Sequence, residues 1–413
     1  MNTAQKIVLL SNAGYLGTLD AARSLGKKDV KIIVADPQKW RLSNWSKYVT
    51  HVSSPSMEDT EEFLVFLKRA AKKGIFTDIL PSSDLMVWYL SSRFKELSKY
   101  FGIKLLNPST MKIVLFKNVL YKFCERHEID IPKTYFPNSY FDVSRISKEA
   151  KYPAIIKHSS SIGFKCKSKG ILVFSTKELI KKYKKDEVMY DRNKIINEVP
   201  QVEWRIIQEY IPNALCNLYN VKGISMRKSK SISIICGKKI RQEPPKLGIS
   251  VCAQPVENRK ITNAVVKLLR ALKYEGIFGV EMIYDERDKK CRIIDFNPRL
   301  TGTNALGTVN GFNISELWYE YISKGKVISN KVFNGNVMLI HLISDLLYLP
   351  GNLLHAPKKG RFFKELFKSY FGLKKFSVFS LDDPMPFVLD VAGTIYNKVK
   401  HPLFYFNEII KGE

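Results

Sequence analysis

The sequence predicts an α/β and α+β chain with three parts: a doubly wound parallel sheet at residues 1–110, an α+β region at 111–325 and a mostly helical extension at 326–413. Through the first part, short β-rich runs alternate with helical patterns, which is typical of a parallel sheet with crossover helices. In the second part the strands follow one another more directly, which indicates antiparallel pairing. We expect each part to form a domain.

The first part opens with a strand at Lys6–Leu10 and a turn that contains Gly14 and Gly17. A second strand at Val30–Val34 ends at Asp36. This pattern would suit a nicotinamide-dependent oxidoreductase, with Asp36 on the ribose, but the third glycine of the dinucleotide fingerprint is missing. We therefore favour a structural turn. The other elements expected here are helices at 61–71 and 85–99 and strands at 78–80 and 103–106.

The second part is expected to mix strands and helices. The helices are expected at 112–127, 177–185 and 261–272, and the strands at 154–157, 171–174, 205–211, 218–221, 231–236, 279–284 and 292–296. An apolar stretch farther along, Val337–Pro350, ends at a proline, and we interpret it as a buried helix.

Composition limits the classes of function. The chain carries 67 Lys+Arg against 39 Asp+Glu, a net charge of +28. This charge fits a solvated lysine-rich surface, or a polyphosphate or anionic membrane partner, and we expect no nucleic-acid partner because no such motif is present. The six cysteines are scattered without a Cys-x-x-Cys pair, and the apolar run Ile7–Leu10 is too short for a signal peptide. We therefore expect a cytoplasmic protein without a transmembrane helix.

A candidate metal site follows from the run Asp295-Phe-Asn297-Pro-Arg299. Side chains alternate along a strand, so Asp295 and Asn297 point the same way and offer oxygen ligands that suit Mg²⁺. Glu281 lies on the preceding apolar strand, and a hairpin through the turn at 285–290 would bring it beside Asp295. Arg299 supplies a planar cation for phosphate oxygens.

Candidate phosphate ligands lie upstream. Lys157 ends an apolar strand and precedes a small-residue loop, Ser159–Gly170, in which Ser161 and Gly163 would fold over phosphates. Lys117 begins the segment that leads to this region. The run from Gln208 through Glu209 to Ile211 follows an apolar strand, and its backbone could read an adenine edge.

The order and spacing of five sequence features resemble the ATP-grasp superfamily. These features are Lys117, Pro-Ala-Ile-Ile-Lys157, Gln208-Glu209-Tyr-Ile, Gly-Val-Glu281 and Asp295-Phe-Asn297-Pro-Arg299. The resemblance is greatest to carboxylate–amine ligases related to carbamoyl phosphate synthase and D-aspartate ligase. It implies a two-subdomain ATP-grasp fold behind the first domain. The segment 239–248 and the run Asp383-Pro-Met-Pro also resemble that subgroup. Asp295 departs from it, because Glu is usual there.

The resemblance also implies a role for each matching residue. Lys117 and Lys157 would contact the ATP phosphates, with Lys157 also near the adenine, and Glu209 and Ile211 would meet the adenine edge. Mg²⁺, with Mn²⁺ as an alternative ion, would be held by Glu281, Asp295 and Asn297. The transferring phosphoryl group would be stabilised by Arg299 and Arg241.

The implied reaction joins a small-molecule carboxylate and an amine through an acyl phosphate. Ser82, Ser83 and Asp84 follow a strand end and are candidates for the acceptor site, although Ser83 or Asp84 would equally serve as a helix N-cap. Neither substrate can be read from the sequence, and a homo-oligomer is left open.

The alternative function concerns the tail. In the segment 358–375, aromatic residues recur at helical spacing among seven basic residues and one acid, Glu365. Such a helix would suit peripheral contact with an anionic membrane, and the protein would then be a membrane-surface binder with a non-catalytic ATP-grasp fold. We favour a helix that packs its aromatic stripe against the body.

Overall fold

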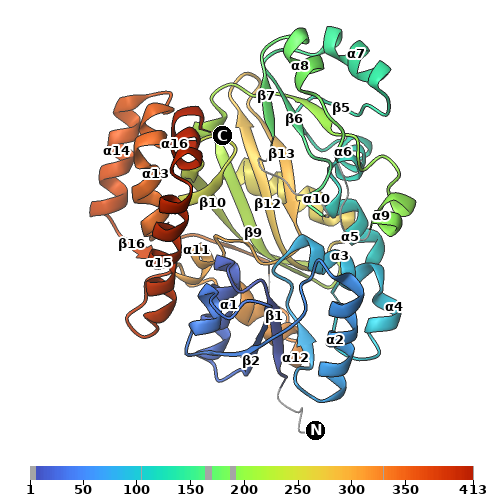
Figure 1. Cartoon of the computed structure of the whole chain (residues 1–413), viewed down its shortest axis with the longest axis vertical. Coiled ribbons are helices and arrows are strands. Elements are labelled where there is room, and N and C mark those ends of the chain that lie inside the picture. The colour runs from blue at the N-terminus through green and yellow to red at the C-terminus, as the bar shows by residue number, and fades with distance from the viewer. Residues whose placement is uncertain (1–5, 104, 163–169, 187–191, 329, 413) are drawn as a thin grey trace.

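The computed structural model describes residues 6–103, 105–162, 170–186, 192–328 and 330–412, and Figure 1 shows their arrangement. The predicted N-terminal parallel sheet is confirmed, with strand order β3-β2-β1-β4. Its elements are β1 (Val8–Ser11), α1 (Leu16–Gly26), β2 (Ile32–Ala35), η1 (Leu42–Trp45), β3 (Val49–Val52), α2 (Thr60–Lys72), β4 (Asp78–Ile79), α3 (Asp84–Ser92) and α4 (Phe94–Leu97). Of the strand expected at 103–106, residue 104 lies outside the described residues and the other three are not in a strand; a parallel bridge joins Asp78 and Gly102.

The helix expected at 112–127 is two helices. Asn107 caps α5 (Pro108–Leu115), accepting a hydrogen bond from the Thr110 N–H at 3.1 Å. Phe116 is fully buried in an extended conformation and separates α5 from α6 (Lys117–Arg126). The break places Lys117 at the first position of α6, where its N–H donates to the Ser159 carbonyl at 2.7 Å.

A small antiparallel sheet with strand order β5-β8-β6-β7 follows. It contains β5 (Thr134–Tyr135), β6 (Ala154–Lys157), β7 (Ile171–Val173) and β8 (Ile206–Glu209), with α7 (Tyr140–Glu149) and α8 (Thr176–Lys182) packed beside it and α9 (Arg192–Glu198) nearby (Figure 1). Alternate residues of β6, Ala154 and Ile156, pack into the core beneath α7 and α8. The strand ends at Lys157, whose side chain is half-buried.

The large sheet has eight strands, in the order β13-β12-β9-β10-β11-β15-β16, with β14 paired to β10. Its strands are β9 (Leu218–Met226), β10 (Ser231–Glu243), β11 (Ile249–Pro255), β12 (Gly276–Asp285), β13 (Lys290–Asn297), β14 (Lys331–Phe333), β15 (Met338–Ile340) and β16 (Lys374–Phe376). The buried residues of α10 (Arg259–Leu272), among them Val265 and Leu268, pack on one face of this sheet. Three short helices complete this region: η2 (Ala214–Cys216), α11 (Ala305–Thr308) and α12 (Ile314–Lys324).

The C-terminal segment is mostly helical, as predicted, and α13 (Leu342–Leu354), α14 (Lys359–Phe371), α15 (Met385–Lys400) and α16 (Pro402–Lys411) lie along one side of the molecule (Figure 1). The segment also gives β14, β15 and β16 to the large sheet. The expected single helix at Val337–Pro350 is therefore wrong: its first residues form β15, which pairs with β11, and α13 continues past Pro350. Within the described ranges, no helix is long and apolar enough to cross a bilayer.

Candidate active site

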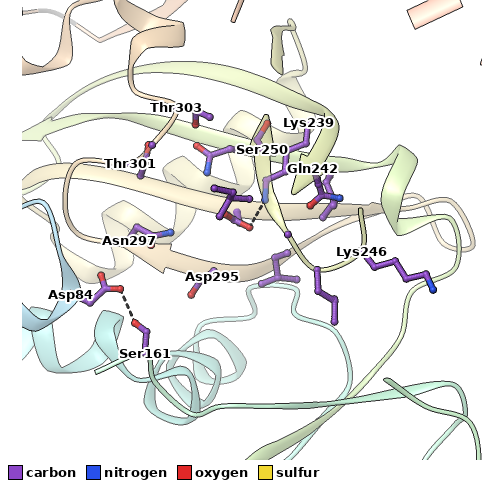
Figure 2. A pocket seen from close by; sticks show the side chains of 18 of the residues that line it. Asp84, Ser161, Lys239, Gln242, Lys246, Ser250, Asp295, Asn297, Thr301 and Thr303 are labelled. Carbon is purple, nitrogen blue, oxygen red and sulfur yellow. Dashed lines mark hydrogen bonds and ion pairs between the residues drawn. The ribbon is translucent and has the colours of Figure 1, made fainter. Parts of the chain in front are cut away.

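A cleft of about 680 Å³ lies where the parts of the chain meet. The small sheet contributes Lys157 and Gln208, the large sheet contributes Glu281 and Asp295, and the N-terminal domain contributes Asp84. Figure 2 shows a close view of such lining residues, with Asp295 and Asn297 on one side of the pocket and Asp84 joined to Ser161. Every described residue expected to bind ATP, Mg²⁺ or the phosphoryl group lines this cleft except Arg241; Gly163 lies outside the described residues.

The oxygen ligands expected for Mg²⁺ share one face of the β12–β13 hairpin. Glu281 is paired with Asp295 across the two antiparallel strands, and Asn297 is paired with Gly279 two residues farther along. Directly opposed residues of such a pair have side chains about 5 Å apart at Cβ. The described residues contain no cluster of three His, Cys, Asp or Glu side chains, so the protein would supply two carboxylates and one amide. This set fits Mg²⁺, which usually takes its other ligands from phosphates and water.

Two lysines neutralise these carboxylates. Lys117 Nζ lies 2.6 Å from Asp295 Oδ1, and Lys239 Nζ lies 2.9 Å from Glu281 Oε2. Burial disfavours the charged form of Lys117, but the carboxylates of Asp295, Asp84 and Glu281 outweigh it and raise the pKa of its ammonium group. Lys117 is therefore a fixed cation at the place where a triphosphate would meet the carboxylates.

The opposite wall is formed by the end of β6 and by β8. Lys157 Nζ donates to Gln208 Oε1 at 2.7 Å, and Gln208 Nε2 donates to Thr134 Oγ1 at 2.8 Å. These bonds hold Lys157 over the cleft. The Glu209 carboxylate accepts from the Lys133 N–H at 2.9 Å and contacts Arg287 Nη2 at 3.2 Å. Because Glu209 also donates its own N–H to the Lys133 carbonyl, it is held rigidly at the rim.

Arg299 is fixed by the N-terminal domain. Its guanidinium makes a bidentate pair with Asp84, at 2.7 and 3.0 Å, and donates to Tyr15 OH at 2.9 Å and to Asn297 Oδ1 at 2.9 Å. Burial disfavours the charged guanidinium, but its interactions with Asp84 and Tyr15 outweigh this effect and raise the pKa of Arg299. Asp84 also accepts from Ser161 Oγ at 2.8 Å, so the N-terminal domain and both sheets meet around one carboxylate.

The comparisons with known proteins agree with this geometry. Residues 117–303 match the ATP-grasp domain family. The chain contains an ATP-grasp domain. It is 22% identical over 309 residues to a D-aspartate ligase from Enterococcus faecium, covering 71% of this chain and 68% of that one. It is 21% identical to the carbamoyl phosphate synthase large chain of Caldanaerobacter subterraneus over 73% of this chain, but it spans only 27% of that relative.

Solved structures share the fold at low sequence identity. An L-amino acid ligase from Bacillus licheniformis superposes with a TM-score of 0.56 and 14% identity, covering 79% of this chain and 76% of that one. The biotin carboxylase domain of a Hydrogenobacter thermophilus 2-oxoglutarate carboxylase, solved with MgADP and bicarbonate, superposes with a TM-score of 0.61 and 14% identity. The match covers 81% of this chain and 73% of that one. At this identity the likeness establishes the two-subdomain ATP-grasp fold.

Arg241 does not belong to the cleft of the ATP-grasp domain. The register of β10 shifts on both sides of Arg241, so Lys239 and Gln242 line the cleft while Arg241 does not. Its guanidinium is buried against Asp345 of α13, with Nε–Oδ1 and Nη2–Oδ2 distances of 2.6 and 2.7 Å. The phosphoryl contact expected of Arg241 is therefore not supported, because the arginine is already paired with Asp345.

Gly17 of the N-terminal turn lies at a close contact between two parts of the chain. A Cβ on Gly17 would lie 2.8 Å from the Thr301 carbonyl oxygen, so this glycine allows α1 to approach the ATP-grasp domain closely. Asp36 accepts hydrogen bonds from the N–H groups of Ala13 and Gln38, both at 2.9 Å. These contacts hold the Asp36 carboxylate against the backbone of the turn.

The three acceptor candidates that follow β4 have different positions. Ser83 caps α3, accepting from the Met86 N–H at 3.2 Å. Ser82 is buried and hydrogen-bonds to the carbonyl of Ser11. Asp84 alone of the three lines the cleft.

Several cleft residues carried no interpretable signal in the sequence. Lys239 lies in a segment that resembles the ligase subgroup, but nothing marked it as the partner of Glu281. The C-terminal helix α15 also contributes to the wall, where Asp390 lies 3.0 Å from His341 Nε2. Lys239 and Glu281 are 42 positions apart, and His341 and Asp390 follow the last of the matching motifs, so only the tertiary structure brings them to the cleft.

Proposed function

We propose that the chain is an ATP-dependent carboxylate–amine ligase that forms an amide through an acyl phosphate in the cytoplasm. The observation that carries the proposal is the Glu281–Asp295 pair, which opposes two carboxylates inside a cleft that also holds Lys117, Lys157 and Arg299. Carboxylates beside fixed cations are what a magnesium-bound triphosphate requires. The D-aspartate ligase and L-amino acid ligase among the similar proteins support the same reaction class.

In this scheme a substrate carboxylate oxygen attacks the γ-phosphorus, and ADP leaves. An amine then attacks the acyl carbon and phosphate leaves, while the nitrogen gives up a proton. Lys117 and Lys157 would hold phosphate oxygens, and Arg299 would offset the charge on the transferring phosphoryl group. A bound Mg²⁺, held by Glu281, Asp295 and Asn297, would neutralise the triphosphate. Positioning and charge supply most of the catalysis.

The N-terminal domain would form part of the substrate site. Tyr15 OH accepts from Arg299 and from the Gly302 N–H at 2.8 Å, so it lies next to the reacting centre. Asp84 fixes the other side of Arg299. A substrate carboxylate that approaches Arg299 would therefore meet polar groups of the N-terminal domain. We propose small-molecule substrates, with amino acids and amino sugars as the first classes to test.

A screen of ADP release would test this function. The full chain is mixed with Mg-ATP and with pairs of carboxylates and amines drawn from amino acids and amino sugars. We expect ADP release that depends on both substrates, together with a thermal stabilisation by Mg-ATP. If Mg-ATP neither stabilises the chain nor is turned over, the ligase proposal fails and the alternative of a non-catalytic membrane-surface binder remains.

A further inference from the structure

The outer surface of the C-terminal helices is apolar. Along α14, Phe363, Phe367 and Phe371 recur every four residues and are 54%, 65% and 76% exposed. The other side of α14 packs on the body, where Ser369 is fully buried and accepts from Arg241 Nη2 at 2.9 Å. The expected packing of the aromatic stripe thus holds for only one side of the helix, and three phenylalanines remain in solvent.

Exposed apolar residues also lie on α15 and α16. On α15, Leu389, Gly393 and Asn397 line the cleft, and the residues on the opposite side of the helix are apolar and exposed. We call the exposed apolar residues of α14, α15 and α16 together the outer face. It consists of Phe363, Phe367, Phe371, Val388, Ile395, Tyr396, Val399, Leu403, Phe404, Phe406 and Ile410.

Charge indicates what covers the outer face. Residues 358–375 carry seven basic side chains and one acid, and Lys364 and Lys375 within this segment are exposed. A second copy of a chain with net charge +28 would bring like charges together, whereas an anionic lipid surface offers the opposite charge. Exposed aromatic residues next to lysines are the composition of interfacial helices, whose rings enter the headgroup region while the ammonium groups stay with lipid phosphates.

We propose that the outer face docks on the surface of an anionic bilayer. Since no described helix can span a membrane, the contact is peripheral, with α14, α15 and α16 lying on the surface. Because α15 has one side in the cleft and the other in the outer face, docking would hold the cleft close to the lipid surface. This inference is independent of the ligase reaction, since none of the outer-face residues lines the cleft.

Vesicle co-sedimentation of the full chain tests the proposal. One vesicle population is phosphatidylcholine alone, and the other also contains phosphatidylglycerol. We expect binding to the anionic vesicles only, weakened by salt. Replacing Phe363, Phe367 and Phe371 together by Ser should lower the apparent affinity by about tenfold or more. Phe141→Ser is the matched control, because Phe141 is 79% exposed on α7, away from the outer face, and should bind like the wild type.

A second variant separates charge from apolar contact. Lys364→Gln with Lys375→Gln should weaken binding to the anionic vesicles by about fivefold for each lysine. Circular dichroism checks that every variant is folded.

Three results would overturn the inference. The first is a wild-type chain that does not co-sediment with anionic vesicles at low salt. The second is a triple phenylalanine variant that binds as well as the wild type. The third is a stable dimer in solution that the triple variant abolishes, which would assign the outer face to a second copy of the chain.

Discussion

Glu281 and Asp295 oppose each other on β12 and β13, and each carboxylate is paired with a different lysine. Lys239 holds Glu281 from the neighbouring part of the large sheet, and Lys117 holds Asp295 from the start of α6. The two lysines reduce the repulsion between the carboxylates. The arrangement therefore presents paired negative charge within a cationic frame, and the first two predictions below rest on it.

Asp295→Ala should lower ADP release by about a hundredfold or more, because it removes a proposed magnesium ligand and the partner of Lys117. Asp295→Glu keeps a carboxylate at this position and should retain most of the activity. Steady-state ADP release measures both variants, and circular dichroism shows that they remain folded. Unchanged ADP release in Asp295→Ala would remove the metal assignment.

Lys157→Ala should also abolish most ATP turnover, because it takes away a cation that Gln208 holds over the cleft. Lys151→Ala is the matched control, since Lys151 is exposed and close in sequence but does not line the cleft. ADP release at saturating substrates compares the two variants. Equal activity in Lys157→Ala and the control would contradict a phosphate role for Lys157.

Arg241→Ala should destabilise the chain by about 3–5 kcal/mol, because it leaves Asp345 buried without its guanidinium partner. The KM for ATP of the folded fraction should stay near the wild-type value. Replacing both residues, as Arg241→Met with Asp345→Leu, should recover much of the stability. Urea unfolding and ATP kinetics measure these effects, and a large loss of turnover at unchanged stability would return Arg241 to the catalytic residues.

Lys222 should make stability depend on pH. It is buried on β9, and burial, assisted by the charge of Lys239, lowers its pKa from 10.5 to about 7. The unfolded chain therefore binds more protons than the folded chain between these two pH values, so the Lys222 contribution makes stability rise with pH across that window. Lys222→Met should abolish this rise. Thermal unfolding of both proteins at pH 7 and at pH 10 tests it, and an identical change in Tm would show that Lys222 is not the cause.

Local patterns were sufficient to predict much of the candidate site. Alternation along β13 placed Asp295 and Asn297 on one face, and the short turn after Glu281 predicted the hairpin that opposes it to Asp295. These relationships are encoded within a few residues, since strand period and turn length are local properties. The break at Phe116 was missed because the helical pattern runs through it, and the extended residue is fixed by burial in the core.

The sequence by itself therefore determined the fold class, the β12–β13 carboxylates and the positions of Lys117 and Lys157. Tertiary structure decided what those patterns could not express. Asp84 pairs with Arg299, which is 215 positions away in the sequence, and Arg241 pairs with Asp345, which is 104 positions away. The packing of distant elements selects each of these partners. The tertiary structure also leaves the phenylalanines of α14 exposed to solvent. Apolar residues occur on two sides of this helix, and only its contact with the body determines which side is buried.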